Sequence, residues 1–259
     1  MFSLGPIMAL CKSPCVVLDG VSVGYYPGKL VLKSITVVLP RGVNVVLGLN
    51  GVGKTTLLRT LAGVLKPVEG SIKFYGVDRG KIHYIPHRLG LLPDLTGVEM
   101  IRFYSEILGF RVDGERVRGL ARELNLDVRL LGKRIGELSN GQQRKLALLI
   151  ALLHDPTLLL VDEITSGIDV VTIESIHNMF RREAERRIIV MTTHNIYEAL
   201  ELADYIHILY DGRIVFTGHI DELMEKCLGG SSRGSESILQ RARAMLDCVV
   251  AMVKGDVAS

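Results

Sequence analysis

The sequence lacks an apolar run long enough to cross a membrane as a helix. The longest uninterrupted run, "LALLIALL", covers residues 146–153, whereas a membrane-spanning helix needs about 20 apolar residues. The N-terminus also lacks the charged-then-apolar pattern of a secretory signal peptide. We therefore expect a chain that does not cross a membrane by itself.

A strong charge of either sign is also missing. The formal net charge of +3 is too small to indicate a nucleic-acid-binding surface. The arginines between residues 181 and 187 alternate with Glu183 and Glu185, a pattern typical of a solvated helix face. We expect no nucleic-acid partner.

Cysteine is scarce, with four residues at positions 11, 15, 227 and 248. They do not have the paired spacing of a metal site, and they are too few for a disulfide scaffold. We expect free thiols in a reducing compartment. A metal site at Cys11 and Cys15 is the less favoured alternative.

What the chain does have is enough apolar sequence for one sizeable core, with 48% hydrophobic and 23% charged residues. Short β-branched runs between residues 15 and 48 predict a strand-rich N-terminal layer. Strands and helices alternate after residue 157, which predicts a largely parallel sheet covered by helices on both faces. We therefore expect an α/β fold with an antiparallel N-terminal layer and a mostly parallel sheet.

The chain divides by composition into one large domain and a C-terminal extension. The domain spans residues 15–228 and includes a helical insert at about residues 88–153, where strand patterns are almost absent. Residues 229–237 are rich in glycine and serine and predict a flexible linker. Residues 238–259 predict an amphipathic helix, which either packs on its own domain or binds a partner or second copy. Its apolar stripe contains Ile238, Ala242, Met245, Val249 and Met252.

The stretch "GLNGVGKTT", residues 48–56, matches the phosphate-loop pattern Gly-x-x-x-x-Gly-Lys-Thr. It follows a predicted strand and precedes a predicted helix, as the phosphate-binding mechanism requires. Lys54 would bind the β- and γ-phosphates of a nucleotide, and the Thr55 hydroxyl would bind Mg²⁺. The nucleotide-binding residues predicted here are Asn50, Gly51, Val52, Gly53, Lys54, Thr55 and Thr56.

The stretch "LLLVDE", residues 158–163, predicts a buried strand that ends in two carboxylates. Ligands of such folds bind at the carboxyl ends of the parallel strands. Asp162 is suited to Mg²⁺, directly or through water, and Glu163 to orienting or deprotonating the water that attacks the γ-phosphate. Together the two stretches predict a phosphate-loop nucleotide hydrolase.

The order of three further motifs is similar to that of the ATP-binding-cassette (ABC) ATPase family. "LSNGQ", residues 138–142, precedes the acidic strand, "SGID", residues 166–169, follows it, and His194 follows the next strand. The resemblance covers about residues 16–228. It implies that two ATPase domains pair head to tail, with "LSNGQ" of one closing over ATP held by the phosphate loop of the other.

The resemblance also implies roles for individual residues. Ser139 and Gly141, with Gln142, would contact the γ-phosphate bound by the partner domain, and a capping box of Ser139 with Gln142 is compatible with that role. Asp169 would lie at the dimer seam, and His194 would contact the γ-phosphate. An aromatic residue that stacks on adenine falls at Tyr26 or at its neighbour Tyr25.

His87, in "YIPHRLGLLPDLTG", departs from the family pattern, which usually has glutamine there. We expect His87 to contact the metal shell or the attacking water in place of that glutamine, or else to point elsewhere without a role. Asn140 replaces the first glycine of the signature, and Ile164 replaces the proline that commonly follows the acidic pair. Lys54 and Glu163 are both present, so we expect an active enzyme.

The resemblance implies the ATP-binding and ATP-hydrolysing subunit of an ABC transporter, of exporter type by the wording of its insert, with ATP and Mg²⁺ as cofactors. Two identical or two different ATPase subunits would pair at the cytoplasmic face of the membrane. A separately encoded integral membrane permease would dock on residues 88–104. The alternative is a soluble family member acting in translation, repair or iron–sulfur assembly. A small-molecule kinase would leave "LSNGQ" and His194 unexplained.

Overall fold

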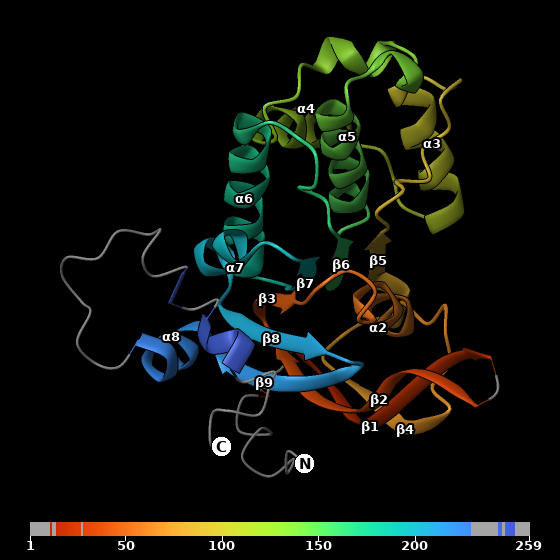
Figure 1. Cartoon of the computed structure of the whole chain (residues 1–259). Helices are drawn as coiled ribbons and strands as arrows, with labels where there is room; N and C mark the ends of the chain where they lie inside the picture. The colour runs from red at the N-terminus through yellow and green to blue at the C-terminus, as the bar shows by residue number, and fades with distance from the viewer. Residues whose placement is uncertain (1–10, 12–13, 27, 229–242, 245–246, 252–259) are drawn as a thin grey trace.

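The structure is a computed structural model that describes residues 11, 14–26, 28–228, 243–244 and 247–251. The described chain contains two sheets, helices that pack against them, and an all-helical segment (Figure 1). No helix among the described residues is long and apolar enough to cross a membrane. The predicted linker lies outside the described residues, as does most of the predicted C-terminal helix.

The central sheet has six strands in the order β5-β6-β7-β3-β8-β9. The first five strands run parallel, and β9 pairs antiparallel with β8. This confirms the α/β prediction of a mostly parallel sheet. The strand bounds are β3 Gly42–Leu47, β5 Ile82–Ile85, β6 Leu158–Asp162, β7 Ile188–Thr193, β8 Tyr205–Tyr210 and β9 Arg213–His219.

Both faces of this sheet are buried, which explains its continuous apolar strands. Successive side chains of a strand point to opposite faces. In β6, Leu158 and Leu160 therefore pack toward one hydrophobic cluster, and Leu159 and Val161 pack toward the other. The second cluster contains α6 (Val170–Ala184), α7 (Ile196–Leu202) and α8 (Ile220–Leu228), together with helices of the insert.

An antiparallel sheet of three strands, in the order β2-β1-β4, covers the other side. Its strands are β1 Cys15–Tyr26, β2 Lys29–Pro40 and β4 Glu69–Tyr75. The helix α2 (Lys54–Leu61) packs through its leucines into the cluster that joins β1 and β2 to the central sheet. The predicted N-terminal β layer is thus confirmed, and it encloses the helix that follows the phosphate loop.

The β layer and the central sheet touch directly where β8 turns into β9. The Lys33 amide of β2 donates to the Gly212 carbonyl at 2.8 Å, and the Lys33 ammonium lies 2.8 Å from Asp211. Gly212 has a φ of 72°, and a Cβ there would lie 2.1 Å from the Val31 carbonyl oxygen. Only glycine fits this contact.

The named elements between β5 and β6 are all helices, and they stand at the end of the molecule away from the β layer (Figure 1). Capping boxes start two of them. Thr96 pairs with Glu99 in one, and Ser139 pairs with Gln142 in the other. The helices are α3 Gly97–Leu108, α4 Gly114–Glu123 and α5 Asn140–Leu153, with 3-10 turns η2 at Val128–Gly132 and η3 at Ile135–Glu137.

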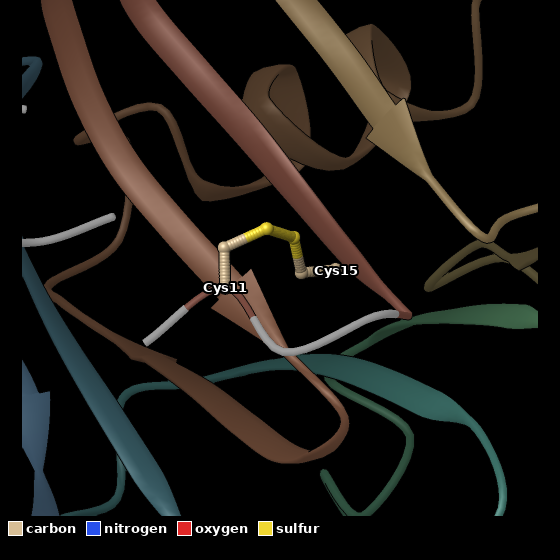
Figure 2. Close-up of a disulfide and its surroundings, with 2 residues drawn as sticks. All are labelled: Cys11 and Cys15. Carbon is tan, nitrogen blue, oxygen red and sulfur yellow. A yellow bond between two sulfur atoms is a disulfide. The ribbon is translucent and has the colours of Figure 1, made fainter. Parts of the chain in front are cut away.

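The cysteines correct one expectation. We expected free thiols, but Cys11 is bonded to Cys15 at the start of β1 (Figure 2), and Cys227 of α8 is bonded to Cys248. The second bond joins residues 21 positions apart, and their proximity depends on the fold. The spacing of cysteines in the sequence carries no signal for such a pair.

Candidate active site

A cleft of about 420 Å³ lies at the carboxyl ends of β3 and β6. Side chains from the phosphate loop, from β1 and from the end of β6 meet there, and His87 borders it. The predicted residues that line it are Asn50, Gly51, Gly53, Lys54, Thr55, Thr56, His87, Asp162 and Glu163. Val52 instead packs against the hydrophobic cluster of the β layer.

The phosphate loop owes its shape to glycine and to the helix that follows it. Gly53 has a φ of 113°, and a Cβ there would lie 2.8 Å from the Leu32 side chain. As N-cap of α2, Gly53 offers no side-chain acceptor to the first-turn amides. Those amides stay available at a helix N-terminus, which favours anions such as phosphate.

Lys54 is almost fully buried, with 5% of its side chain exposed. Its Nζ donates to the carbonyl oxygens of Gly48 at 2.8 Å and Leu49 at 3.1 Å. It also lies 3.0 Å from the Glu163 carboxylate. The phosphate loop therefore holds the Lys54 ammonium in the cleft, beside the carboxylate of Glu163, the residue that follows β6.

Asp162 is the centre of a hydrogen-bond network. The Thr55 hydroxyl donates to its Oδ2 at 2.7 Å, and the Thr192 hydroxyl of β7 donates to its Oδ1 at 2.6 Å. The Tyr84 hydroxyl lies 3.5 Å from Oδ2. Burial, followed by the charge of Asp162, raises the pKa of Tyr84 to about 12, which keeps this phenol protonated as a donor.

Thr55 and Asp162 fit Mg²⁺. Each offers a hard oxygen ligand, and the two oxygens lie 2.7 Å apart. Mg²⁺ in phosphoryl-transfer sites is usually held by one or two carboxylates, phosphates and water, without a full cage of protein ligands. Within the described chain, no group of three or more His, Cys, Asp or Glu side chains could hold a metal.

Glu163 occupies a left-handed turn, with a φ of 47°. Its amide donates to the Thr192 hydroxyl at 3.1 Å, and its carboxylate lies between Lys54 and His194, whose Nδ1 is 3.6 Å away. Partial burial acts to raise the pKa of Glu163, but the hydrogen bond and charge of Lys54, together with those of His194, lower it below its ordinary value. Glu163 is thus an ionised carboxylate that faces the cleft.

Thr192 and Tyr84 were missed by the sequence-based prediction. Thr192 pairs in register with Asp162 across the parallel strands β6 and β7, and β5, which carries Tyr84, pairs with β6 on its other side. The stretch "MTTH" at the end of an apolar strand is the signal that points to Thr192. Its pairing with Asp162 requires the strand register.

The signature residues lie away from the cleft of their own chain. Ser139 accepts a hydrogen bond from the Gln142 amide, and Gln142 accepts one from the Ser139 amide. Gly141 packs closely on α6, because a Cβ there would lie 3.1 Å from the Thr172 hydroxyl and 3.4 Å from the Asp169 carboxylate. None of Ser139, Gly141, Gln142 and Asp169 lines the cleft that contains Lys54.

His87 is exposed and borders two clefts. One is the cleft with Lys54, and the other, of about 410 Å³, is lined by residues of the α5 start and of the loop after β6, among them Asn140 and Ser166. His194 is half exposed beside Glu163. His87 thus lies between the cleft that contains Lys54 and the cleft beside the start of α5.

The two neighbouring tyrosines differ in their surroundings. Tyr25 lines the cleft, and its hydroxyl shares a hydrogen bond of 3.3 Å with the Thr56 hydroxyl. Tyr26 is 74% exposed and does not line the cleft. Of the pair, Tyr25 therefore has its ring held at the rim of the phosphate loop.

Comparison with known proteins agrees with this geometry. The sequence model of the family described as "ABC transporter" matches residues 32–166. An uncharacterized ABC transporter ATP-binding protein from Methanocaldococcus jannaschii is 31% identical over 78% of this chain and 77% of its own length. The glycine betaine/carnitine/choline transport ATP-binding protein OpuCA from Bacillus subtilis is 32% identical, but the 80% of this chain that matches spans only 58% of that protein.

The fold agrees as well. A solved dimeric structure of an ATP-binding cassette, in a post-hydrolysis state bound to ADP and Pi, superposes with a TM-score of 0.71 at 25% identity, covering 79% of this chain and 98% of the other. The matched family segment contains both the phosphate loop and the acidic strand that form the cleft. By sequence, fold and site geometry together, the chain belongs to the ABC transporter family.

Proposed function

We propose that the cleft carries out Mg²⁺-dependent hydrolysis of ATP, and that this chain is the ATP-hydrolysing subunit of a transporter. The observation that carries the proposal is the pairing of two sets of groups in one cleft. Thr55 lies against Asp162, and Lys54 lies against Glu163. A metal-binding pair and a phosphate-binding cation beside a carboxylate are the groups that phosphoryl transfer to water requires.

Each side chain has a distinct role. The first-turn amides of α2 and the Lys54 ammonium bind the β- and γ-phosphates. Glu163 accepts a hydrogen bond from the attacking water and takes its proton as the new bond to phosphorus forms and the bond to the ADP oxygen breaks. His194, beside Glu163, contacts the γ-phosphate and keeps the carboxylate oriented.

Thr55 and Asp162 would hold Mg²⁺, with Thr192 and Tyr84 orienting Asp162 through hydrogen bonds. When bound, Mg²⁺ neutralises charge on the phosphate oxygens. His87, at the border of the cleft, would contact the metal shell or the attacking water. Tyr25 is the better supported of the two tyrosines to stack on adenine, because it lines the cleft, while Tyr26 is the alternative.

The separation of the signature from the cleft supports a paired enzyme. Ser139, Gly141 and Gln142 would contact ATP held by a second subunit, and Asp169 would lie at the seam between them. The dimeric ADP- and Pi-bound relative supports this arrangement. The second subunit is either an identical copy or a different ATPase subunit.

The names of the relatives favour a role in transport over a soluble role in translation, repair or iron–sulfur assembly. We therefore propose that an integral membrane permease is the partner, that it docks on residues 88–104, and that the chain acts at the cytoplasmic face of the membrane. Export, which the wording of the insert favours, and import are the two alternatives for the direction of transport.

The test has two parts. Purified protein with ATP and Mg²⁺ should release inorganic phosphate without an added acceptor, and Glu163→Gln should lower the rate by about 10²- to 10⁴-fold, the usual contribution of a general base. Glu163→Gln should also form an ATP-dependent dimer in size-exclusion chromatography. Phosphate release that is unaffected by Glu163→Gln would refute the catalytic assignment.

The proposed membrane partner has its own test. Gentle extraction of native membranes with the tagged protein should recover a multi-span permease.

A further inference from the structure

Arg144 is a buried cation with no role in the function derived so far. It lies in the second turn of α5, the helix that begins after Ser139, and is 9% exposed. Its Nη1 donates to the main-chain carbonyl oxygen of Glu163 at 3.4 Å. A side chain of the signature helix thus contacts the backbone of the residue that faces Lys54.

The contacted backbone is in an unfavourable conformation. A φ of 47° at Glu163 is a left-handed conformation that residues other than glycine rarely adopt, and it persists only where the surroundings hold it. The Glu163 amide is held by the Thr192 hydroxyl at 3.1 Å. Its carbonyl accepts hydrogen bonds from the Ser166 amide at 3.2 Å and from Arg144 at 3.4 Å, and Arg144 is the side chain of the two. Together these contacts fix the peptide units on both sides of Glu163.

Burying a guanidinium costs free energy unless its charge and donors find partners, so the contacts of Arg144 indicate why it is buried. Burial lowers the pKa of Arg144, and the Glu163 charge partly offsets that effect. The second cleft, which Arg144 lines, contains Arg88 and no carboxylate among its lining residues. No acidic side chain in that cleft is therefore available to take Arg144 away from the Glu163 carbonyl.

The adjacent residue gives a direct comparison. Lys145 is also buried, at 6% exposure, and its Nζ donates to the Asn125 carbonyl at 3.2 Å. Asn125 follows α4, so Lys145 joins two parts of the insert. Of these two neighbouring buried cations on α5, Arg144 is the one directed to the active site.

We propose that Arg144 is a positioning residue for hydrolysis: by holding the Glu163 carbonyl, it maintains the left-handed turn that directs the Glu163 carboxylate to Lys54 and the attacking water. This inference rests on the proposed function, in which Glu163 is the general base. Arg144 does not touch ATP in this role. It acts on kcat through the orientation of Glu163.

The kinetic test compares Arg144→Met with Lys145→Met, since each removes one buried cation from the same helix. Arg144→Met should lower kcat by about 10- to 100-fold, the effect of a misplaced catalytic group, with the KM for ATP unchanged. Lys145→Met should lose thermal stability but keep a kcat close to that of wild type. Arg144→Lys, which retains a cationic donor of shorter reach, should recover part of the kcat.

A wild-type kcat in Arg144→Met, or an equal loss of kcat in both methionine variants, would overturn the proposal. Arg144→Gln replaces Arg144→Met if the latter folds poorly.

A crystal structure of the Arg144 variant gives a readout that does not depend on turnover. Glu163 should leave the left-handed region and its carboxylate should separate from Lys54, whereas an unmoved Glu163 would overturn the inference. Failure of the wild-type protein to hydrolyse ATP would refute the proposed function, and the crystal structure alone would then decide whether Arg144 holds Glu163.

Discussion

The Nζ of Lys54 and the Oε1 of Glu163 lie 3.0 Å apart, and both side chains are largely buried, at 5% and 18% exposure. The phosphate-binding cation and the proposed general base therefore form an ion pair within one cleft. Phosphate oxygens that enter the cleft would share Lys54 with Glu163. In the proposed mechanism, binding and catalysis thus depend on the same ammonium group.

Replacing Lys54 by methionine should weaken nucleotide binding. A hydrogen bond to a charged group contributes about 1.5–3 kcal/mol, so the dissociation constant for ATP should rise roughly 10- to 100-fold. Equilibrium titration with a fluorescent ATP analogue measures this. Lys66→Met, at an exposed lysine beyond α2, is the matched control and should bind like wild type. Equal affinities in both variants would contradict a phosphate-binding role for Lys54.

Thr192→Val should reduce the ATPase rate while preserving side-chain volume. The change leaves a carboxylate oxygen of Asp162 and the amide of Glu163 without their partner at 2.6 Å and 3.1 Å. Each unsatisfied buried group costs about 1–3 kcal/mol, and Asp162 and Glu163 both lose orientation. Steady-state kinetics and urea unfolding should show both effects. Thr60→Val, which removes a buried hydroxyl that donates within α2, should affect stability more than the rate.

Reduction of the disulfides should destabilise the protein unequally. Cys227 and Cys248 are 21 residues apart, and Cys11 and Cys15 are 4 apart. The chain-entropy estimate of the stabilisation is therefore about 3 kcal/mol for the Cys227–Cys248 bond and about 2 kcal/mol for the Cys11–Cys15 bond. Cys227→Ala should therefore lower the melting temperature more than Cys11→Ala. Thiol titration of the unreduced, denatured protein should find no free thiol. Four titratable thiols would contradict both bonds.

Acidification should destabilise the fold through two buried histidines. Burial lowers the pKa of His207 to about 3, and burial together with His154 lowers the pKa of His83 to about 3. The unfolded chain binds a proton at each site near its ordinary pKa of about 6.5. Between these values the unfolded state holds more protons, so the free energy of unfolding falls as pH drops from about 6.5 and levels off below about 3.

Urea unfolding of the wild-type protein between about pH 7 and about pH 4 measures this slope. The double variant His83→Asn, His207→Asn should show a smaller decrease in the free energy of unfolding over that range, because it lacks both groups. His219→Asn, at a partly exposed histidine, serves as the control and should retain the wild-type slope. Equal slopes in all three proteins would show that other groups govern the acid response.

The parts of the fold and the site that follow local rules could be predicted from the sequence. The phosphate loop, the acidic strand and the helical insert are each recognised from a short segment, because glycine, strand period and capping residues act locally. The role of Thr192 could not be predicted, since it depends on the register of β7 against β6. Arg144 was missed for a related reason, because its partner is a main-chain carbonyl 19 residues away and leaves no side-chain signal.

The contact between the β layer and the central sheet has a mechanical consequence. Gly212 lies so close to Val31 that no side chain fits there, and Lys33 ties the same turn to β2 through its amide and its ammonium. With α2 filling the space between the sheets, these parts have no room to slide over one another. They form a stiff frame around the phosphate loop. We therefore expect a displacement that begins at a bound phosphate to move the helices between β5 and β6, which stand at the end of the molecule away from the β layer, rather than to deform this frame.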